Sequence, residues 1–154
     1  MAQLQMLEGE VEVKCSADRI FEMIVAKKSD YPNLCSKVLG STTLHHNDWT
    51  SVGCTRKWDF IIDGKSRYVI EKVESIDEEN KIVRHSLVEG DNLQTHYKKL
   101  ENKVQVIPKE NSCCMVRITF EYEKMNEDAP PPHHLMELGL SCFKELGSHL
   151  ANCN

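Results

Sequence analysis

Few side chains in this sequence could do chemistry, and His85 is the first of them. It lies at the centre of the stretch I-V-R-H-S-L-V, residues 82–88, which the residue pattern predicts to be a strand. Histidine is the side chain whose charge changes near neutral pH. On an apolar wall its imidazole could be a core group satisfied by a neighbour, a ligand contact, or a group that moves a proton.

The other histidines do not form a metal site by their spacing. His45-His46 and His133-His134 are adjacent pairs, whereas ligands on one helix face are three or four residues apart. Only His133 and Glu137 have that spacing, and two ligands at the start of a helix do not complete a tetrahedral site. The sequence also lacks a nucleophile elbow, a P-loop and a dinucleotide fingerprint. We therefore expect neither a metal nor a cofactor.

The cysteines number seven, and no two are spaced as C-x-x-C. An odd count without metal-type spacing favours free thiols in a reducing compartment. The first ten residues lack the basic and apolar regions of a secretory signal, and no segment approaches the length of a membrane span. We expect a cytoplasmic protein whose cysteines are reduced: Cys15, Cys35, Cys54, Cys113, Cys114, Cys142 and Cys153.

Alternating apolar and polar residues predict about seven strands with short connections, which favours antiparallel pairing. One strand precedes a helix that Ser16 caps and that runs to about Lys27, and a short helix or turn ends near Cys35. Asp63-Gly64 is a turn of the kind that hairpins prefer. The expected strands are 7–15, 37–45, 54–62, 66–75, 82–88, 93–107 and 113–122.

The last part of the chain predicts one long amphipathic helix. Pro130, Pro131 and Pro132 precede it, and its apolar residues repeat at helical spacing as far as Leu150. One helix covers only part of so broad a sheet, and the aromatic content of 6% leaves few large side chains to fill the interior. The order of elements therefore predicts one domain, residues 1–154, with an internal pocket.

The overall charge excludes one class of partner. The net charge of −5 argues against binding nucleic acid, which needs clustered Lys and Arg. The partner that remains is a small hydrophobic or amphipathic molecule. The oligomeric state is left open by the sequence.

Several motifs in order resemble the plant major latex protein group of the Bet v 1 and pathogenesis-related class 10 superfamily. They are K-I-V-R-H-S-L-V-E-G-D at 81–91, Y-K-K at 97–99, V-Q-V-I-P at 104–108, F-E-Y-E-K at 120–124, N-D-W-T-S-V-G at 47–53 and D-G-K at 63–65. The resemblance implies an α+β helix-grip fold, a seven-stranded antiparallel sheet wrapped around a long C-terminal helix with two short helices. It also implies a role in plant secondary metabolism or defence. The glycine-rich loop of the Bet v 1 branch is reduced here to residues 47–53, which makes ribonuclease activity less credible.

Matching these motifs assigns side chains to the inner face of the sheet. Because alternate residues of a strand share a face, one matched position fixes its neighbours. Among the polar residues, His85, Asn102, Tyr68 and Arg56 are expected on the inner wall, where an unpaired polar group costs about 1–3 kcal/mol. The expected ligand-binding residues are Trp58, Phe60, Tyr68, Ile70, Val83, His85, Leu100, Asn102, Val104, Phe120, Leu138, Cys142, Phe143 and Leu146.

Two functions remain open. The first is an intracellular binding or carrier protein for a hydrophobic plant metabolite. The second is a cofactor-free isomerase or cyclase acting on an alkaloid or terpenoid intermediate, in which His85, with Tyr68, moves a proton.

Overall fold

A curved seven-stranded sheet wraps around one long helix in the computed structural model of the chain. The structure describes residues 4–27, 30–45, 51–91 and 93–151. The strands are β1 (Leu4–Val13), β2 (Val38–His45), β3 (Thr55–Ile62), β4 (Lys65–Asp77), β5 (Ile82–Gly90), β6 (Tyr97–Pro108) and β7 (Cys114–Lys124). The helices are α1 (Ala17–Val25), α2 (Tyr31–Leu34), α3 (Leu93–His96) and α4 (His133–Ala151).

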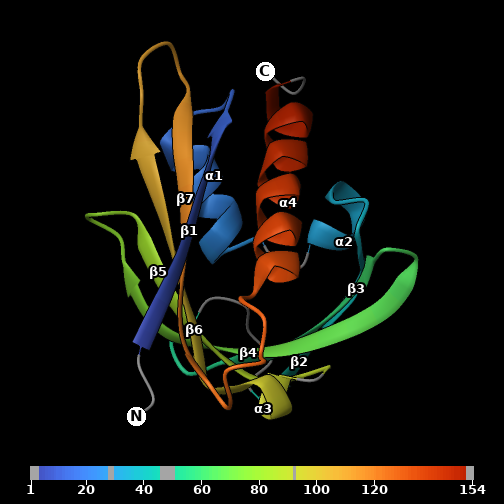
Figure 1. Cartoon of the computed structure of the whole chain (residues 1–154). Coiled ribbons are helices and arrows are strands. Elements are labelled where there is room, and N and C mark those ends of the chain that lie inside the picture. The colour runs from blue at the N-terminus through green and yellow to red at the C-terminus, as the bar shows by residue number, and fades with distance from the viewer. Residues whose placement is uncertain (1–3, 28–29, 46–50, 92, 152–154) are drawn as a thin grey trace.

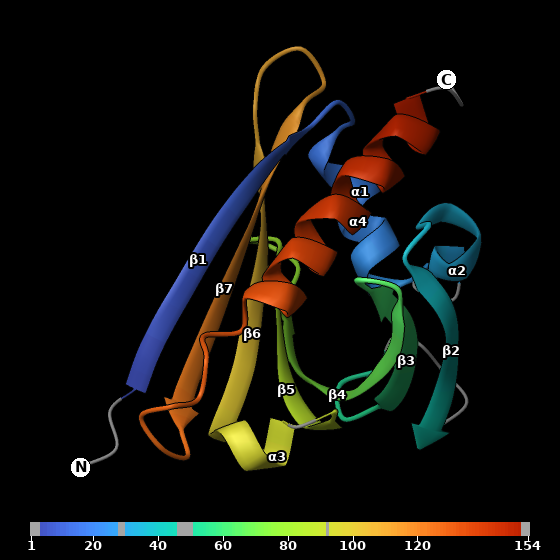
Figure 2. The same ribbon diagram turned by 45° about the vertical axis from the view of Figure 1, so that its right-hand side comes forward.

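The sheet has the order β1-β7-β6-β5-β4-β3-β2, and every neighbouring pair is antiparallel. Figure 1 shows α4 in front of its concave face, and Figure 2 shows the sheet curving around that helix from β1 to β2. Register shifts interrupt the β2–β3, β4–β5 and β6–β7 pairs. Such bulges bend strands, so they help the sheet to curl. The predicted fold class is confirmed.

The predicted helix starts follow from local capping chemistry. The Ser16 hydroxyl accepts a hydrogen bond of 3.3 Å from the backbone N–H of Arg19, which satisfies a free donor at the start of α1. The three prolines directly precede α4, as expected. Near its other end, α4 lies so close to β1 that a Cβ added at Gly147 would collide with the Val13 side chain. The absence of a side chain at Gly147 therefore permits this close packing.

One predicted strand is partly wrong. Residues 93–107 were expected to form a single strand, but Leu93–His96 form α3 and only the rest belongs to β6. This turn of helix connects β5 to β6 at one end of the sheet (Figure 2). The sequence L-Q-T-H lacks the alternation of a strand, so the local pattern does not oppose a helical turn.

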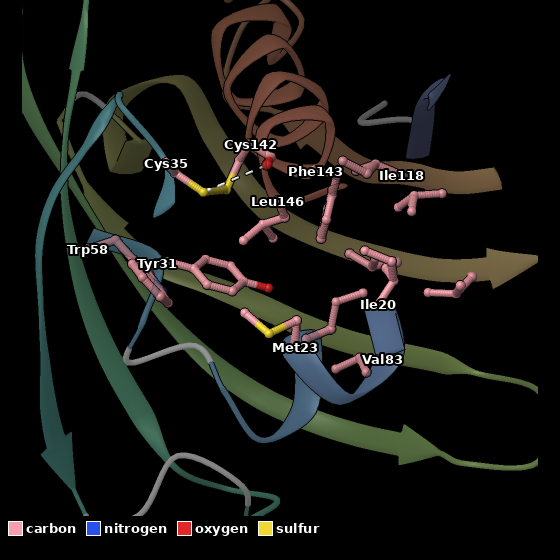
Figure 3. Close-up of a cluster of buried hydrophobic side chains, with 14 of the residues drawn as sticks. Ile20, Met23, Tyr31, Cys35, Trp58, Val83, Ile118, Cys142, Phe143 and Leu146 are labelled. Atoms are coloured by element: carbon pink, nitrogen blue, oxygen red, sulfur yellow. Dashed lines mark hydrogen bonds between the residues drawn. A yellow bond between two sulfur atoms is a disulfide. The ribbon is translucent and has the colours of Figure 1, made fainter. Parts of the chain in front are cut away.

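The core lies between the concave face and α4. Buried side chains from β7, α1 and α4 meet there, including Ile118, Ile20 and Leu146 (Figure 3). Side chains do not fill all of the space between the sheet and α4, and two hollows remain beside the core.

Candidate ligand-binding chamber

A cavity of about 140 Å³ lies between the concave face of the sheet and α4, and we call it the inner chamber. Its wall is almost entirely apolar, with polar side chains only from α2 and four strands. Of the expected ligand-binding residues, nine line it: Trp58, Phe60, His85, Asn102, Val104, Phe120, Leu138, Cys142 and Phe143. An apolar cavity with a few convergent polar groups is the usual form of a small-molecule site.

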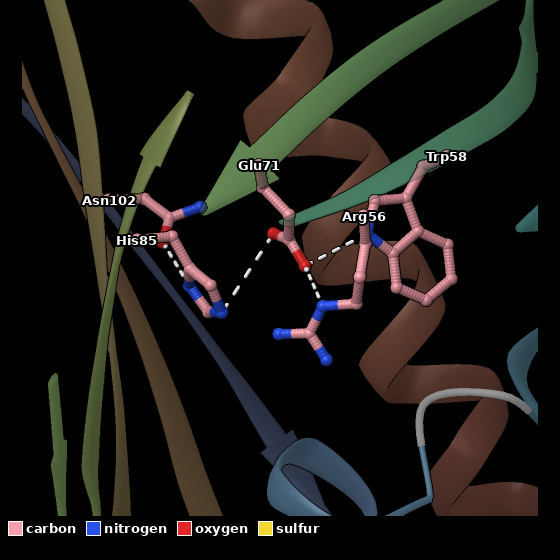
Figure 4. Close-up of polar contacts among 5 residues, drawn as sticks. All are labelled: Arg56, Trp58, Glu71, His85 and Asn102. Atoms are coloured by element: carbon pink, nitrogen blue, oxygen red, sulfur yellow. Dashed lines mark hydrogen bonds and ion pairs between the residues drawn. The ribbon is translucent and has the colours of Figure 1, made fainter. Parts of the chain in front are cut away.

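A set of buried and half-buried polar side chains lies at one wall, and we call it the polar cluster. It consists of Arg56 and Trp58 from β3, Glu71 from β4, His85 from β5 and Asn102 from β6 (Figure 4). The strand register brings the members together, because residues opposite each other on paired strands share a face. Arg56 is opposite Glu71, and His85 is opposite Asn102.

Glu71 is the centre of the polar cluster. Its Oε1 accepts a hydrogen bond of 2.8 Å from the indole N–H of Trp58 and lies 3.3 Å from Nε of Arg56. Its Oε2 lies 3.8 Å from Nε2 of His85. Only 1% of Arg56 and 7% of Glu71 is exposed, so these opposite charges compensate each other away from water.

His85 is oriented by a contact with Asn102. Its Nδ1 lies 2.8 Å from Oδ1 of Asn102. Because an amide oxygen only accepts hydrogen bonds, this contact places the proton of a neutral imidazole on Nδ1. Nε2 then faces the Glu71 carboxylate. The arrangement fixes both the tautomer and the orientation of a ring that is 2% exposed.

Tyr31 of α2 also lines the inner chamber and was not expected there. Its ring lies against that of Trp58, with centroids 5.6 Å apart. Burial raises the pKa of its hydroxyl well above the usual value, and the nearby Glu71 carboxylate raises it further, while Arg56 acts in the opposite direction. The phenol is therefore held in its neutral form.

A second hollow of about 270 Å³, the outer hollow, adjoins the inner chamber. Phe60, Val69 and Leu135 line both spaces. The outer hollow lies beside α3 and the proline segment, where the Tyr97 hydroxyl donates a hydrogen bond to the carbonyl oxygen of Pro130.

The predicted placement of Tyr68 and Ile70 on the inner wall is wrong. On β4 the buried residues are Val69, Glu71 and Val73, whereas Tyr68 and Ile70 belong to the alternate set. The Tyr68 hydroxyl hydrogen-bonds Glu89 at 3.1 Å, and its ring lies under Nζ of Lys57, on the side of the sheet away from His85. Tyr68 lines the outer hollow but is separated from the polar cluster.

Three other expected residues are buried without lining the inner chamber. Val83, Leu100 and Leu146 are at most 5% exposed and belong to the packed core. Their side chains face the interior, as expected, but they are not among the residues that line the cavity. Face assignment alone does not separate core residues from lining residues.

The sequence contained a signal for the missed residue Glu71. Asp63 and Gly64 both have positive φ angles, 52° and 76°, and form the two-residue turn that joins β3 to β4. A two-residue turn fixes the register of its hairpin, which places Trp58 opposite Val69 and Arg56 opposite Glu71. With Trp58 directed inward, the turn alone would have assigned Glu71 to the inner face. Tyr31 had no comparable signal, since its position depends on how α2 packs.

The expectation that all cysteines are free is also wrong. Cys35, directly after α2, and Cys142 of α4 form a disulfide with Cα atoms 5.3 Å apart. Cys15, Cys54, Cys113 and Cys114 form no disulfide. Cys153 lies outside the described residues. The two cysteines are 107 residues apart in sequence, so the complete fold brings them together. Local cysteine spacing could not have predicted this disulfide.

The remaining features considered in the sequence are metal ligands and membrane-spanning segments. Within residues 4–27, 30–45, 51–91 and 93–151, no group of three or more His, Cys, Asp and Glu side chains could hold a metal ion. His133 and His134 are exposed at the start of α4. His46 and Trp49 lie outside the described residues. Over the same part of the chain, no helix has both the length and the apolarity to cross a membrane.

Comparison with known proteins assigns this architecture to a family. The sequence profile of the Pathogenesis-related protein Bet v 1 family matches residues 2–153. Major latex protein 146 of Papaver somniferum is 33% identical over 142 residues, which are 92% of this chain and 87% of the poppy protein. A crystal structure of ginseng major latex-like protein 151 from Panax ginseng superposes with a TM-score of 0.86 at 26% identity, covering 95% of this chain and 97% of the ginseng chain.

A curled sheet around a long helix with an apolar chamber defines a class of small α+β proteins, and this chain belongs to its Bet v 1 family. The resemblance noted in the sequence is thereby confirmed. The Arabidopsis thaliana MLP-like protein 34 is 34% identical over 145 residues, 94% of this chain. The chain spans about half the length of that relative, 46%.

Proposed function

We propose that this protein binds a hydrophobic or amphipathic plant metabolite in the inner chamber and carries it in the cytoplasm. The observation that supports this best is the contrast between an apolar wall and one buried polar cluster. Burial of apolar ligand surface supplies affinity at roughly 25 cal/mol per Å². The polar cluster supplies orientation, because a ligand that met only apolar groups would bind in many poses. The adjoining outer hollow offers a route of entry or space for a larger ligand.

Isothermal titration calorimetry with flavonoids, sterols and cytokinins tests this proposal. Replacing Leu138 with Trp should fill the chamber from α4, whereas Glu137→Trp adds the same side chain on the exposed face of that helix. We expect micromolar binding by the wild type, about −8 kcal/mol, and a loss of about tenfold or more in Leu138→Trp alone. Equal affinities in both variants would place the ligand elsewhere, and no binding across the panel would contradict the proposal.

A second candidate, a cofactor-free isomerase or cyclase of an alkaloid or terpenoid intermediate, is favoured by the setting of His85. The imidazole is fixed by Asn102, its Nε2 faces a carboxylate, and it borders a largely apolar cavity. These are conditions under which a histidine transfers protons. Tyr68 has no part in this version, since its side chain lies on the other side of the sheet.

Turnover of alkaloid and terpenoid precursors separates the two candidates. His85→Gln keeps much of the volume and hydrogen bonding but removes the titratable nitrogen, so a catalytic role predicts a loss of roughly 10²-fold. His149→Gln, on an exposed histidine of α4, is the matched control. Equal turnover by the wild type and His85→Gln would remove His85 as the proton shuttle. If the wild type converts none of these precursors, the binding function is the only one of the two candidates that remains.

A further inference from the structure

The Tyr31 hydroxyl differs from the polar groups around it. Glu71 meets Trp58 and Arg56 through one oxygen and His85 through the other, and the second nitrogen of His85 meets Asn102. Tyr31 is 6% exposed, and its hydroxyl has no hydrogen-bond partner among the described residues. A buried hydroxyl without a partner is costly, so its presence in a chamber wall calls for a partner from outside the chain.

The position of this hydroxyl is firmly set. The Tyr31 ring packs on Trp58, and its oxygen points to the interior between Met23 and Leu146 (Figure 3). The segment after α2 is attached to α4 twice, by the disulfide of Cys35 and by Ser36. The backbone N–H and the hydroxyl of Ser36 donate hydrogen bonds of 2.9 and 2.7 Å to the Glu145 carboxylate. A donor held in this way can discriminate between ligands, because it cannot turn away from a ligand that fails to accept.

The charges nearby determine what kind of acceptor fits. Glu71 and Arg56 both act on the Tyr31 oxygen, and the carboxylate has the larger effect of the two. Negative charge is therefore disfavoured at this point of the chamber. A ligand group that accepts from Tyr31 should be neutral.

We propose that the Tyr31 hydroxyl is the specificity-determining donor of the inner chamber and selects ligands whose polar end is a neutral hydrogen-bond acceptor, such as a ketone or aldehyde carbonyl. This inference rests on the proposed function, namely that the chamber binds a small amphipathic molecule. It adds the chemical class of the polar end and the residue that recognises it.

Three naphthalenes of nearly equal size test the inference by calorimetry. 2-Acetylnaphthalene carries a neutral carbonyl, 2-ethylnaphthalene replaces the carbonyl with a methylene, and 2-naphthoate is an anion at neutral pH. Each is titrated into the wild type, Tyr31→Phe and Tyr122→Phe. Tyr122→Phe is the matched control, since it removes the hydroxyl of another buried tyrosine, one that lines neither the inner chamber nor the outer hollow.

The wild type and Tyr122→Phe should bind the ketone about tenfold more tightly than either other compound. In Tyr31→Phe, the preference for the ketone over 2-ethylnaphthalene should disappear while the affinity for 2-ethylnaphthalene stays the same. The ligand-free Tyr31→Phe protein should melt no lower than the wild type, because it loses an unpartnered hydroxyl. This thermal measurement shows that any loss of ketone affinity is not a folding defect.

The outcomes separate the inference from the function on which it rests. If Tyr31→Phe keeps the preference for the ketone, or the wild type has none, Tyr31 is not the selecting donor although the chamber binds ligands. If 2-naphthoate binds as tightly as the ketone, the requirement for a neutral group is overturned. If none of the three compounds binds the wild type while flavonoids or sterols do, the inference fails alone. If nothing binds, the proposed function fails with it.

Discussion

At the scale of single residues, the structure differs most from the sequence prediction at β4. The run Tyr68, Val69, Ile70 contains three consecutive apolar residues, so alternation cannot decide which of them face inward. A charged residue at position 71 then favours the wrong choice, because a glutamate is almost never fully buried unless it is paired. Here Arg56 is the partner that makes the burial of Glu71 possible. Hydrophobic pattern could not predict this pair, but the two-residue turn could.

The first prediction concerns Glu71. Glu71→Gln leaves the buried Arg56 guanidinium without its carboxylate, so we expect a loss of about 3–5 kcal/mol in the free energy of unfolding. Urea denaturation measures this. Glu74→Gln, three residues along the same strand, loses an exposed pair with Lys72 and should change stability by less than about 1 kcal/mol. Similar losses in both variants would show that Arg56 does not depend on Glu71.

At the scale of elements, the order and type were largely predictable from periodicity and capping signals. The helix starting after Ser16, the helix after the three prolines and the antiparallel strands all follow from local pattern. What local pattern could not supply was the contact between distant elements. The packing of α2 against α4 joins Cys35 to Cys142 and places Tyr31 in the chamber wall, and it depends on the complete fold.

The second prediction concerns this disulfide. It closes a loop of about 107 residues, so removing it should increase the entropy of the unfolded chain and lower stability by about 2–5 kcal/mol. Thermal unfolding with and without dithiothreitol measures the effect. Thiol titration in denaturant should find two fewer thiols before reduction than after. An unchanged melting temperature and equal thiol numbers would return Cys35 and Cys142 to the reduced state expected from the sequence.

The third prediction concerns Tyr97 of β6, whose hydroxyl is hydrogen-bonded to Pro130 beside the outer hollow. Burial, with a smaller effect of nearby Tyr122, raises the pKa of Tyr97 to about 12. An unfolded tyrosine ionises near pH 10, so between about pH 10 and 12 the unfolded chain loses a proton that the folded chain keeps. Stability is therefore full below about pH 10 and falls as the pH rises towards 12, with Tyr97 contributing up to about 2 kcal/mol.

Tyr97→Phe should flatten this alkaline loss, which urea unfolding at a series of pH values measures. Part of the loss should remain, because burial also raises the pKa of Tyr31. Tyr68 also contributes to what remains, because its hydrogen bond to Glu89 raises the pKa of its hydroxyl. An equally steep fall in the wild type and Tyr97→Phe would mean that the phenol ionises alike in the folded and unfolded chain.

At the scale of the whole molecule, the sequence indicated a sheet broader than one helix can cover. The structure has this form, with α4 across a concave seven-stranded sheet and the two hollows beside it. The sizes of these spaces could not be predicted, because they depend on which buried side chains reach the cavity. The central claim is that the inner chamber holds a ligand next to the polar cluster.

Trp58 provides the most direct test of that claim, since its ring lines the inner chamber and its indole N–H is bonded to Glu71. In Trp49→Phe it is the single tryptophan of the chain. Titrating this variant with flavonoids and sterols should shift or quench its emission in a saturable way, with a Kd in the micromolar range, about −8 kcal/mol. If no compound of a broad panel changes the emission of the folded protein, the chamber does not bind this class of ligand.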